Sequence, residues 1–135
     1  MEKNTNVIAV FDKTGSNVLM CRRRKDPFKG LLNLVGGKIE PGEDAMAAAY
    51  RELEEETGIT RADIRLIHMM DFTYHLQSLK MEVYYGFLEK EITVHGEENE
   101  LFWIDRQQDY ADEKVFAGYG NLGHIMALIE KYEKQ

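Results

Sequence analysis

The chain has 135 residues, a length that predicts one domain with a sizeable core. Its formal net charge of −7 argues against a surface for duplex nucleic acid or an anionic membrane, because both need clustered cations. The single cysteine, Cys21, excludes an intrachain disulfide and a cysteine-based zinc site. No run approaches the roughly 18 apolar residues of a membrane span, and the first residues lack the pattern of a secretion signal. We therefore expect a cytoplasmic protein.

The first half of the chain predicts three short strands and a helix. Apolar runs at 7–11 and 18–22, separated by a polar turn, predict two strands. A third apolar run at 31–35 ends at a pair of glycines. Residues 44–57 contain no glycine or proline, are rich in alanine and glutamate, and stop at a glycine, so they predict a helix with a glycine after its last turn.

The second half predicts strands and a closing helix. Residues 64–74 and 79–88 read as two longer strands joined by a short connection, and 101–104 reads as a third strand. Apolar residues at helical spacing predict a helix over 122–134, with Asn121 as its N-cap. Strands and helices in this order indicate an α+β fold, a mixed sheet with helices packed on it, and a single domain over 1–135.

Three glutamates gather on one face of the helix predicted at 44–57. At about 100° per residue, Glu52, Glu55 and Glu56 share a narrow face, whereas Glu54 points the opposite way. Like charges at this spacing oppose the helix and raise one another's pKa values. A hard divalent cation relieves both effects, and Mg²⁺ binds carboxylates together with water and substrate phosphates. Glutamate-rich helices are common at solvated surfaces, however, so this run alone favours a surface helix, and the longer pattern around it decides between that and a magnesium site.

The segment 37–59 resembles the Nudix box, the signature of the Nudix hydrolases. That pattern starts with a glycine, five residues of any type and a glutamate. Seven residues later come an arginine and a glutamate, an apolar residue, any residue and two glutamates. After one more residue of any type, the pattern ends with a glycine and an apolar residue. The positions of the pattern are filled without departure by Gly37, Glu43, Arg51, Glu52, Leu53, Glu55, Glu56, Gly58 and Ile59. Average residue usage makes such a match improbable, on the order of 10⁻⁹ per starting position.

The resemblance implies the Nudix fold, a mixed sheet sandwiched between helices (α/β/α), and hydrolysis of a nucleoside diphosphate linked to another group. By the same resemblance Glu52, Glu55 and Glu56 hold Mg²⁺, for which Mn²⁺ can substitute, and the carbonyl of Gly37 is a further ligand. Glu52 or Glu55 is the expected general base, and the sequence does not separate the two. Arg51, four residues before Glu55, is expected to orient that carboxylate.

Further residues are expected to complete the metal site and to bind the phosphates. The resemblance implies one more metal-binding glutamate from the loop before the strand at 101–104, for which Glu98 is the first choice and Glu100 the second. Arg22 and Arg23 end the second strand, where MutT-like members of the family carry a phosphate-binding arginine. Lys38 follows the glycine pair and is placed to reach a phosphate.

Base recognition is assigned to two amides. Asn33 offers a donor and an acceptor that suit a purine edge, and MutT-like enzymes place an asparagine near the start of the last helix, where Asn121 lies. ADP-ribose-specific relatives carry a proline some fifteen residues beyond the box, whereas here the only prolines are Pro27 and Pro41. The expected substrate is a nucleoside triphosphate, with an oxidised purine such as 8-oxo-dGTP first.

The resulting hypothesis is a MutT-like pyrophosphohydrolase that releases a nucleoside monophosphate and pyrophosphate. The alternative substrates are other nucleoside diphosphate conjugates: a nucleotide sugar, a dinucleoside polyphosphate or ADP-ribose. A nucleotide-sensing regulator without catalysis is disfavoured because every box glutamate is present. The partner is a small-molecule nucleotide, and the sequence leaves open whether the chain forms a homodimer.

Overall fold

The structure, a computed structural model, describes residues 3–26, 28–75, 78–118 and 120–134. In these ranges the elements, in chain order, are β1 (Lys3–Phe11), β2 (Asn17–Arg22), β3 (Leu32–Asn33), β4 (Val35–Lys38), α1 (Ala45–Thr57), β5 (Ile67–Tyr74), β6 (Leu79–Phe87), β7 (Glu100–Asp105) and α2 (Asn121–Glu133). No helix among the described residues is long and apolar enough to cross a membrane.

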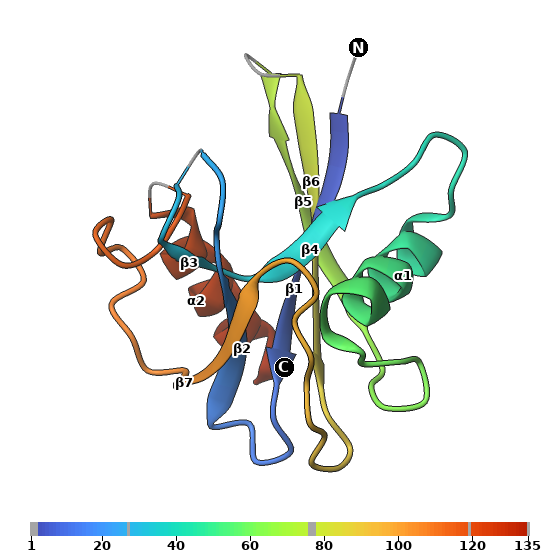
Figure 1. The fold of residues 1–135 in the computed structure, drawn as a ribbon. Helices are drawn as coiled ribbons and strands as arrows, with labels where there is room; N and C mark the ends of the chain where they lie inside the picture. Colours follow the sequence, from blue (N-terminus) through green and yellow to red (C-terminus); the bar gives the residue numbers. More distant parts are fainter. Residues whose placement is uncertain (1–2, 27, 76–77, 119, 135) are drawn as a thin grey trace.

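The strands form one mixed sheet around β1. Its order is β3-β2-β1-β6-β5; β4 also pairs with β1, and β7 with β2. β1 and β6 are parallel, and the other pairs are antiparallel. The two helices lie on opposite sides of the sheet (Figure 1). The predicted α+β fold, a sheet sandwiched between helices, is confirmed.

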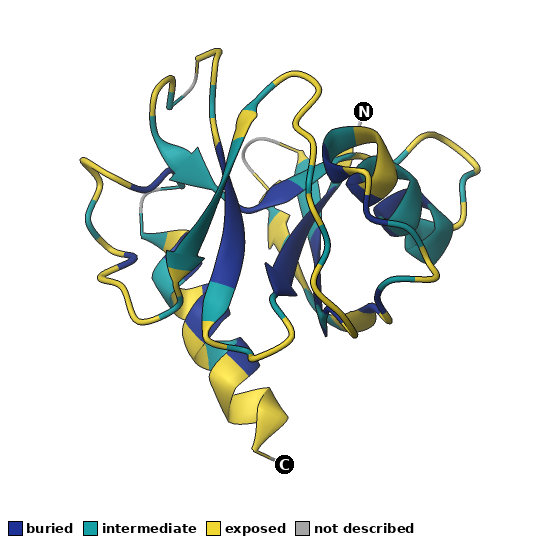
Figure 2. Ribbon diagram, turned by 60° about the horizontal axis from the view of Figure 1, so that its bottom comes forward, coloured by how far each residue is buried: buried dark blue, intermediate teal, exposed yellow. Residues whose placement is uncertain are grey.

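Alternate residues of β1 supply the two halves of the core. Val7 and Ala9 belong to the cluster that includes Ile129 of α2, whereas Ile8 and Val10 belong to the cluster beneath α1. Because both faces of β1 are covered, this strand is apolar without interruption from Val7 onward, as a strand buried on both sides should be. Figure 2 shows the buried strands at the centre of the molecule, with the exposed residues on the loops and the outer helix faces.

Helix α1 begins and ends where the sequence indicates. The side chain of Asp44 caps its N-terminus by accepting a hydrogen bond from the backbone N–H of Ala47 (3.0 Å). Gly58 adopts a left-handed conformation (φ 83°), and its N–H donates to the carbonyl of Glu54 (2.9 Å). Leu53 is fully buried and seats the helix on the sheet. These local signals fix the phase of the helix, and with it the direction of the glutamates.

Two predicted elements differ from the structure. The run at 31–35 is two strands, because Leu32 and Asn33 pair with β2 whereas the chain from Val35 onward pairs with β1. The expected N-cap role of Asn121 is wrong: Gly120 is the N-cap of α2, and no side chain caps the helix. Gly120 has φ 87°, a conformation that glycine adopts readily, so the chain enters the helix there.

Gly36 brings β4 against β1 more closely than any side chain allows. A Cβ at this position would lie 2.1 Å from the backbone oxygen of Asn6, and the φ of Gly36 is +151°. We predict that Gly36→Ala lowers the free energy of unfolding by about 3 kcal/mol or more, measured by urea denaturation. Gly30→Ala is the matched control, because Gly30 also has positive φ (+87°) but no atom within 4 Å. It should cost only about 1–2 kcal/mol, and equal losses in the two variants would contradict the steric argument.

Candidate active site

The glycine pair of β4 lies directly against the glutamates of α1. A Cβ on Gly37 would lie 2.3 Å from the carboxyl carbon of Glu52, so any larger residue there would displace this carboxylate. The backbone N–H of Gly36 donates to Oε2 of Glu56 (3.3 Å). The two glycines therefore set the distance between the sheet and the carboxylates, and they place backbone groups of β4 beside them.

Arg51 ties the glutamates to the loop before the helix. Its Nε and Nη2 donate to the carboxylate of Glu43 (2.7 and 3.0 Å), and Nη2 also donates to the carbonyl of Lys38 (3.0 Å). Its Nη1 contacts Glu52 (3.0 Å) and Glu55 (3.2 Å). The hydrogen bonds from Arg51 lower the pKa of Glu43 to about 2. The expected contact between Arg51 and Glu55 is present, and Arg51 holds Glu52 as well.

The glutamates of α1 carry more negative charge than their surroundings neutralise. Burial raises the pKa of Glu56 to about 7, and the charges of Glu52, Glu98 and Glu55 add to the shift. Burial also raises the pKa of Glu52. Several carboxylate oxygens, in a place where ionisation is opposed by burial and by like charge, are a donor set that suits a hard divalent cation. The residues present therefore fit a Mg²⁺ or Mn²⁺ site.

Two connected hollows meet at Glu56. The smaller one, here called the acidic pocket, has a volume of about 560 Å³ and is lined by Glu52, Glu54, Glu55, Glu56, Glu97, Glu98, Asn99 and Leu101. The larger one, here called the groove, has a volume of about 980 Å³ and shares Glu56, Glu97, Glu98 and Asn99 with it. The structure thus brings Glu98 beside the glutamates of the helix. The described lining of the two hollows does not include Glu100, the second choice.

The groove also collects positive charge. Arg23, Arg24, Lys25 and Lys38 line it together with Asn33. Nη1 of Arg24 donates to the carbonyl of Glu98 (2.7 Å), which joins the basic end of β2 to the acidic loop. Anionic and cationic side chains thus line one hollow, an arrangement that can accept a metal and a chain of phosphates together.

Arg22 and Asn121 do not belong to the described lining of the groove. Arg22 donates to the carbonyl of Gly30 (2.9 Å) and lies over the ring of Phe102 (5.1 Å). Arg22 is the last residue of β2, whereas the next residue, Arg23, lies beyond the strand and lines the groove. Nδ2 of Asn121 donates to the hydroxyl of Tyr74 (2.8 Å). The two predicted base-reading amides are therefore not brought to the same hollow.

Sequence reasoning missed Asn6 and Glu97 as members of the site. Asn6 is only 2% exposed, and its Oδ1 accepts a hydrogen bond from the N–H of Gly37 (2.9 Å). Its Nδ2 has no hydrogen-bond partner among the described residues. The available signal was a polar residue at the start of an apolar strand, which by itself does not say what it contacts. Glu54, which helical spacing predicted to point away from the other glutamates, also lines the acidic pocket.

Known proteins match this chain in sequence and in fold. The chain is 34% identical over 95 residues to an ADP-ribose pyrophosphatase of Bacillus subtilis, covering 70% of this chain and 49% of that protein. It is 31% identical over 75 residues to the 8-oxo-dGTP diphosphatase of Escherichia coli, covering 55% and 58%. The chain thus spans about half the length of these two relatives.

A solved structure and a family model extend the match to most of the chain. A structure from a study of MutT from Aliivibrio salmonicida and Vibrio cholerae superposes with a TM-score of 0.74 at 24% identity, covering 97% of this chain and 99% of that one. This likeness concerns the fold. The model of the NUDIX domain matches residues 2–117, which include the whole glutamate helix and the glycine pair. The chain belongs to the Nudix family.

Proposed function

We propose that this protein hydrolyses a nucleoside triphosphate to a nucleoside monophosphate and pyrophosphate, with Mg²⁺ as its metal and Mn²⁺ as a substitute. The observation that carries the proposal is the meeting of the acidic pocket and the groove at Glu56, with the cations Arg23, Arg24 and Lys38 along the groove. A polyphosphate needs both, because cations bind its terminal oxygens and a metal neutralises the phosphates next to the bond that breaks.

In this proposal Glu52, Glu55 and Glu56 hold the metal, with the carbonyl of Gly37 and Glu98 as further ligands. Bound there, the metal supplies charge neutralisation and lowers the pKa of a bound water. Glu52 is favoured over Glu55 as general base. Its side chain is 14% exposed against 58% for Glu55, it lies against Gly37, and burial raises its pKa toward the range that suits a base near neutral pH. Arg51 keeps both carboxylates in position.

Base recognition is proposed for Asn33. It lines the groove, and its Oδ1 accepts a hydrogen bond from the N–H of Leu34 (2.9 Å), which orients the amide. Asn121 is left out of this role, because its amide already donates to Tyr74. An oxidised purine such as that of 8-oxo-dGTP is the proposed base, in keeping with the resemblance to the 8-oxo-dGTP diphosphatase of Escherichia coli.

ADP-ribose is the second candidate substrate, and a specific observation favours it. The ADP-ribose pyrophosphatase of Bacillus subtilis matches 70% of this chain, more than the 55% matched by the 8-oxo-dGTP diphosphatase. Against it stands the absence of a proline beyond the box, since the last proline is Pro41. The charge of the groove also favours a triphosphate, whose terminal phosphate needs more cations than a ribose does.

A substrate panel separates the two candidates. With Mg²⁺, kcat/KM for 8-oxo-dGTP or dGTP should exceed that for ADP-ribose by about ten-fold or more, the equivalent of one further charge-assisted contact. The product measured should be pyrophosphate and not orthophosphate. If ADP-ribose is the best substrate and yields AMP and ribose 5-phosphate, the triphosphate assignment is wrong.

Removing one charge at the deepest carboxylate should stop catalysis without unfolding the protein. We predict that Glu56→Gln lowers kcat by at least about 100-fold, because a ligand of the metal is lost. Its melting temperature in the absence of metal should hold or rise, because like-charge repulsion on α1 is relieved. Glu130→Gln, an exposed change on α2, is the matched control and should keep full activity. A Glu56→Gln enzyme with nearly normal kcat would remove this residue from the site.

The raised pKa of Glu56 makes the stability of the metal-free protein depend on pH. With an ordinary value of 4.5 in the unfolded chain and about 7 in the folded one, the folded state binds the proton more tightly. The free energy of unfolding should therefore fall as pH rises from about 4.5 to 7 and then level off. Glu56→Gln should lack this component, so its stability relative to the parent protein should be greater at about pH 8 than at about pH 5. Urea denaturation in a chelator tests this; parallel pH curves for the two proteins would contradict it.

A further inference from the structure

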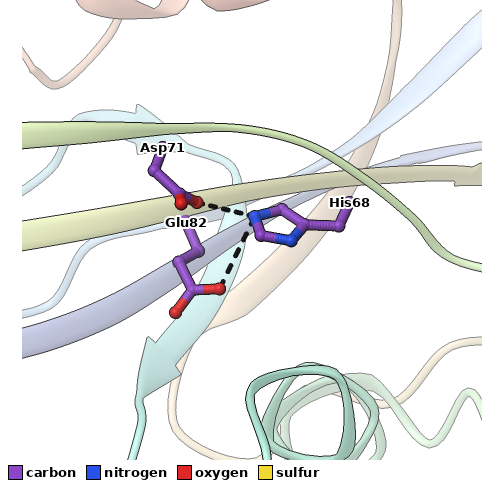
Figure 3. Close-up of side chains that lie close together, drawn as sticks. All are labelled: His68, Asp71 and Glu82. Carbon is purple, nitrogen blue, oxygen red and sulfur yellow. Dashed lines mark hydrogen bonds and ion pairs between the residues drawn. The ribbon is translucent and has the colours of Figure 1, made fainter.

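A second group of metal-ligand side chains lies on β5 and β6, apart from the acidic pocket. Nε2 of His68 is 2.6 Å from Oδ1 of Asp71 and 3.5 Å from Oε1 of Glu82. One ligand atom from each residue lies within 4.8 Å of the other two. Figure 3 shows the imidazole edge and the two carboxylates pointing toward one another. None of the three belongs to the described lining of the acidic pocket or the groove.

A β-bulge brings the three side chains together. In a regular strand His68 and Asp71, three residues apart, would point to opposite faces of the sheet. Here the register shifts between His68 and Met70, so that His68 pairs with Tyr84 and Asp71 pairs with Glu82. Tyr84 and Glu82 are two residues apart and face the same side, so both β5 residues do as well. Bulges commonly re-aim a side chain in this way beside a functional site.

The neighbours of the cluster hold its ligand atoms in place. The ring of His68 stacks on that of Tyr84, with the centroids 4.6 Å apart and the planes at 22°. The hydroxyl of Tyr84 donates to Oε1 of Glu82 (2.9 Å). Imidazole and carboxylate are therefore oriented before any ligand arrives, which lowers the cost of binding one.

Besides the imidazole, the two carboxylates of the cluster share one cationic side chain among their described neighbours. Glu82 is only 6% exposed, and its described partners are the hydroxyl of Tyr84 and the imidazole of His68. Asp71 has one ammonium nearby, Nζ of Lys80, at 3.9 Å. A buried carboxylate is costly unless it is well paired. A dication bound between the two carboxylates would neutralise both of them.

We propose that His68, Asp71 and Glu82 form a binding site for a divalent transition metal of the Zn²⁺ class. One imidazole nitrogen with two carboxylates suits such an ion, whereas Mg²⁺ prefers oxygen alone. Bonds of about 2.1 Å in a tetrahedral site put ligand atoms roughly 3.4 Å apart. His68 and Glu82 already lie at that separation, and Asp71, on the exposed side, needs to withdraw by less than about 1 Å.

The proposed site is separate from the one under α1. Gly37, which touches Glu52, pairs with Asn6 across β4 and β1, and Asn6 pairs with Glu82 across β1 and β6. Two strand spacings put the backbones of Gly37 and Glu82 about 10 Å apart, and Glu82 is absent from the described lining of the acidic pocket. In a tetrahedral site, three protein ligands leave a fourth position for water or for a ligand from a partner molecule.

The inference does not depend on the proposed hydrolase activity.

The test is a calorimetric titration of the purified chain with Zn²⁺ in a large excess of Mg²⁺, which occupies the all-oxygen site. One Zn²⁺ per chain should bind, and His68→Phe, which keeps a ring over Tyr84 but removes the nitrogen, should weaken it by at least about ten-fold. Asp71→Asn, at an exposed position, should weaken it too. His124→Asn, an exposed histidine on α2, is the matched control and should bind as the parent protein does. A thermal melt of each variant verifies that it is folded.

A second measurement identifies the ligand directly. Two-dimensional ¹⁵N–¹H spectra of the imidazole groups should show Zn²⁺ shifting the signals of His68 and leaving those of His124 unchanged. Zn²⁺ binding that survives His68→Phe but is lost in Glu56→Gln would place the ion in the acidic pocket and overturn the proposal. So would the absence of Zn²⁺ binding in the presence of Mg²⁺.

Discussion

The site depends on how closely the two glycines of β4 let that strand approach the carboxylates of α1. Gly36 and Gly37 let β4 lie against both β1 and α1, where a Cβ would overlap the backbone of Asn6 or the carboxylate of Glu52. The contact fixes the depth of Glu56, which accepts a hydrogen bond from Gly36. It also explains why the glycine that opens the box lies so far from the glutamates in sequence: it belongs to the other wall of the same site.

Such a site is held together against its own charge. Burial and mutual repulsion raise the pKa of Glu56, so the ionised cluster lowers the stability of the fold, as groups with shifted pKa values at functional sites often do. Arg51 limits that loss by contacting Glu43, Glu52 and Glu55 at once. Arg51 and Glu55 are four residues apart, about one helical turn, and this spacing places the guanidinium beside the carboxylate.

The parts of this structure that could be predicted are those set by neighbours in sequence. Helix α1, its caps and the shared face of Glu52 and Glu56 follow from local signals and helical spacing. The parts that could not be predicted are set by strand pairing between distant residues. The contact of Asn6 with Gly37 and the pairing of Asp71 with Glu82 depend on strand register. A shift of one residue would turn each side chain of the strand to the other face of the sheet. The same holds for the division of 31–35 into two strands, since only the choice of partner strand separates them.

The distinction between local and distant determinants also bears on substrate. The glutamates lie on a regular helix, whereas the cations of the groove come from the end of β2 and from Lys38, and Glu98 comes from a loop. Loops and strand ends change more freely than a packed helix does, because fewer buried contacts constrain them. An ADP-ribose pyrophosphatase and an 8-oxo-dGTP diphosphatase both occur among the relatives of this chain, as expected where one fold serves several substrates. What sets the substrate of this chain is therefore to be sought along the groove, whose described lining includes cations and the amide of Asn33.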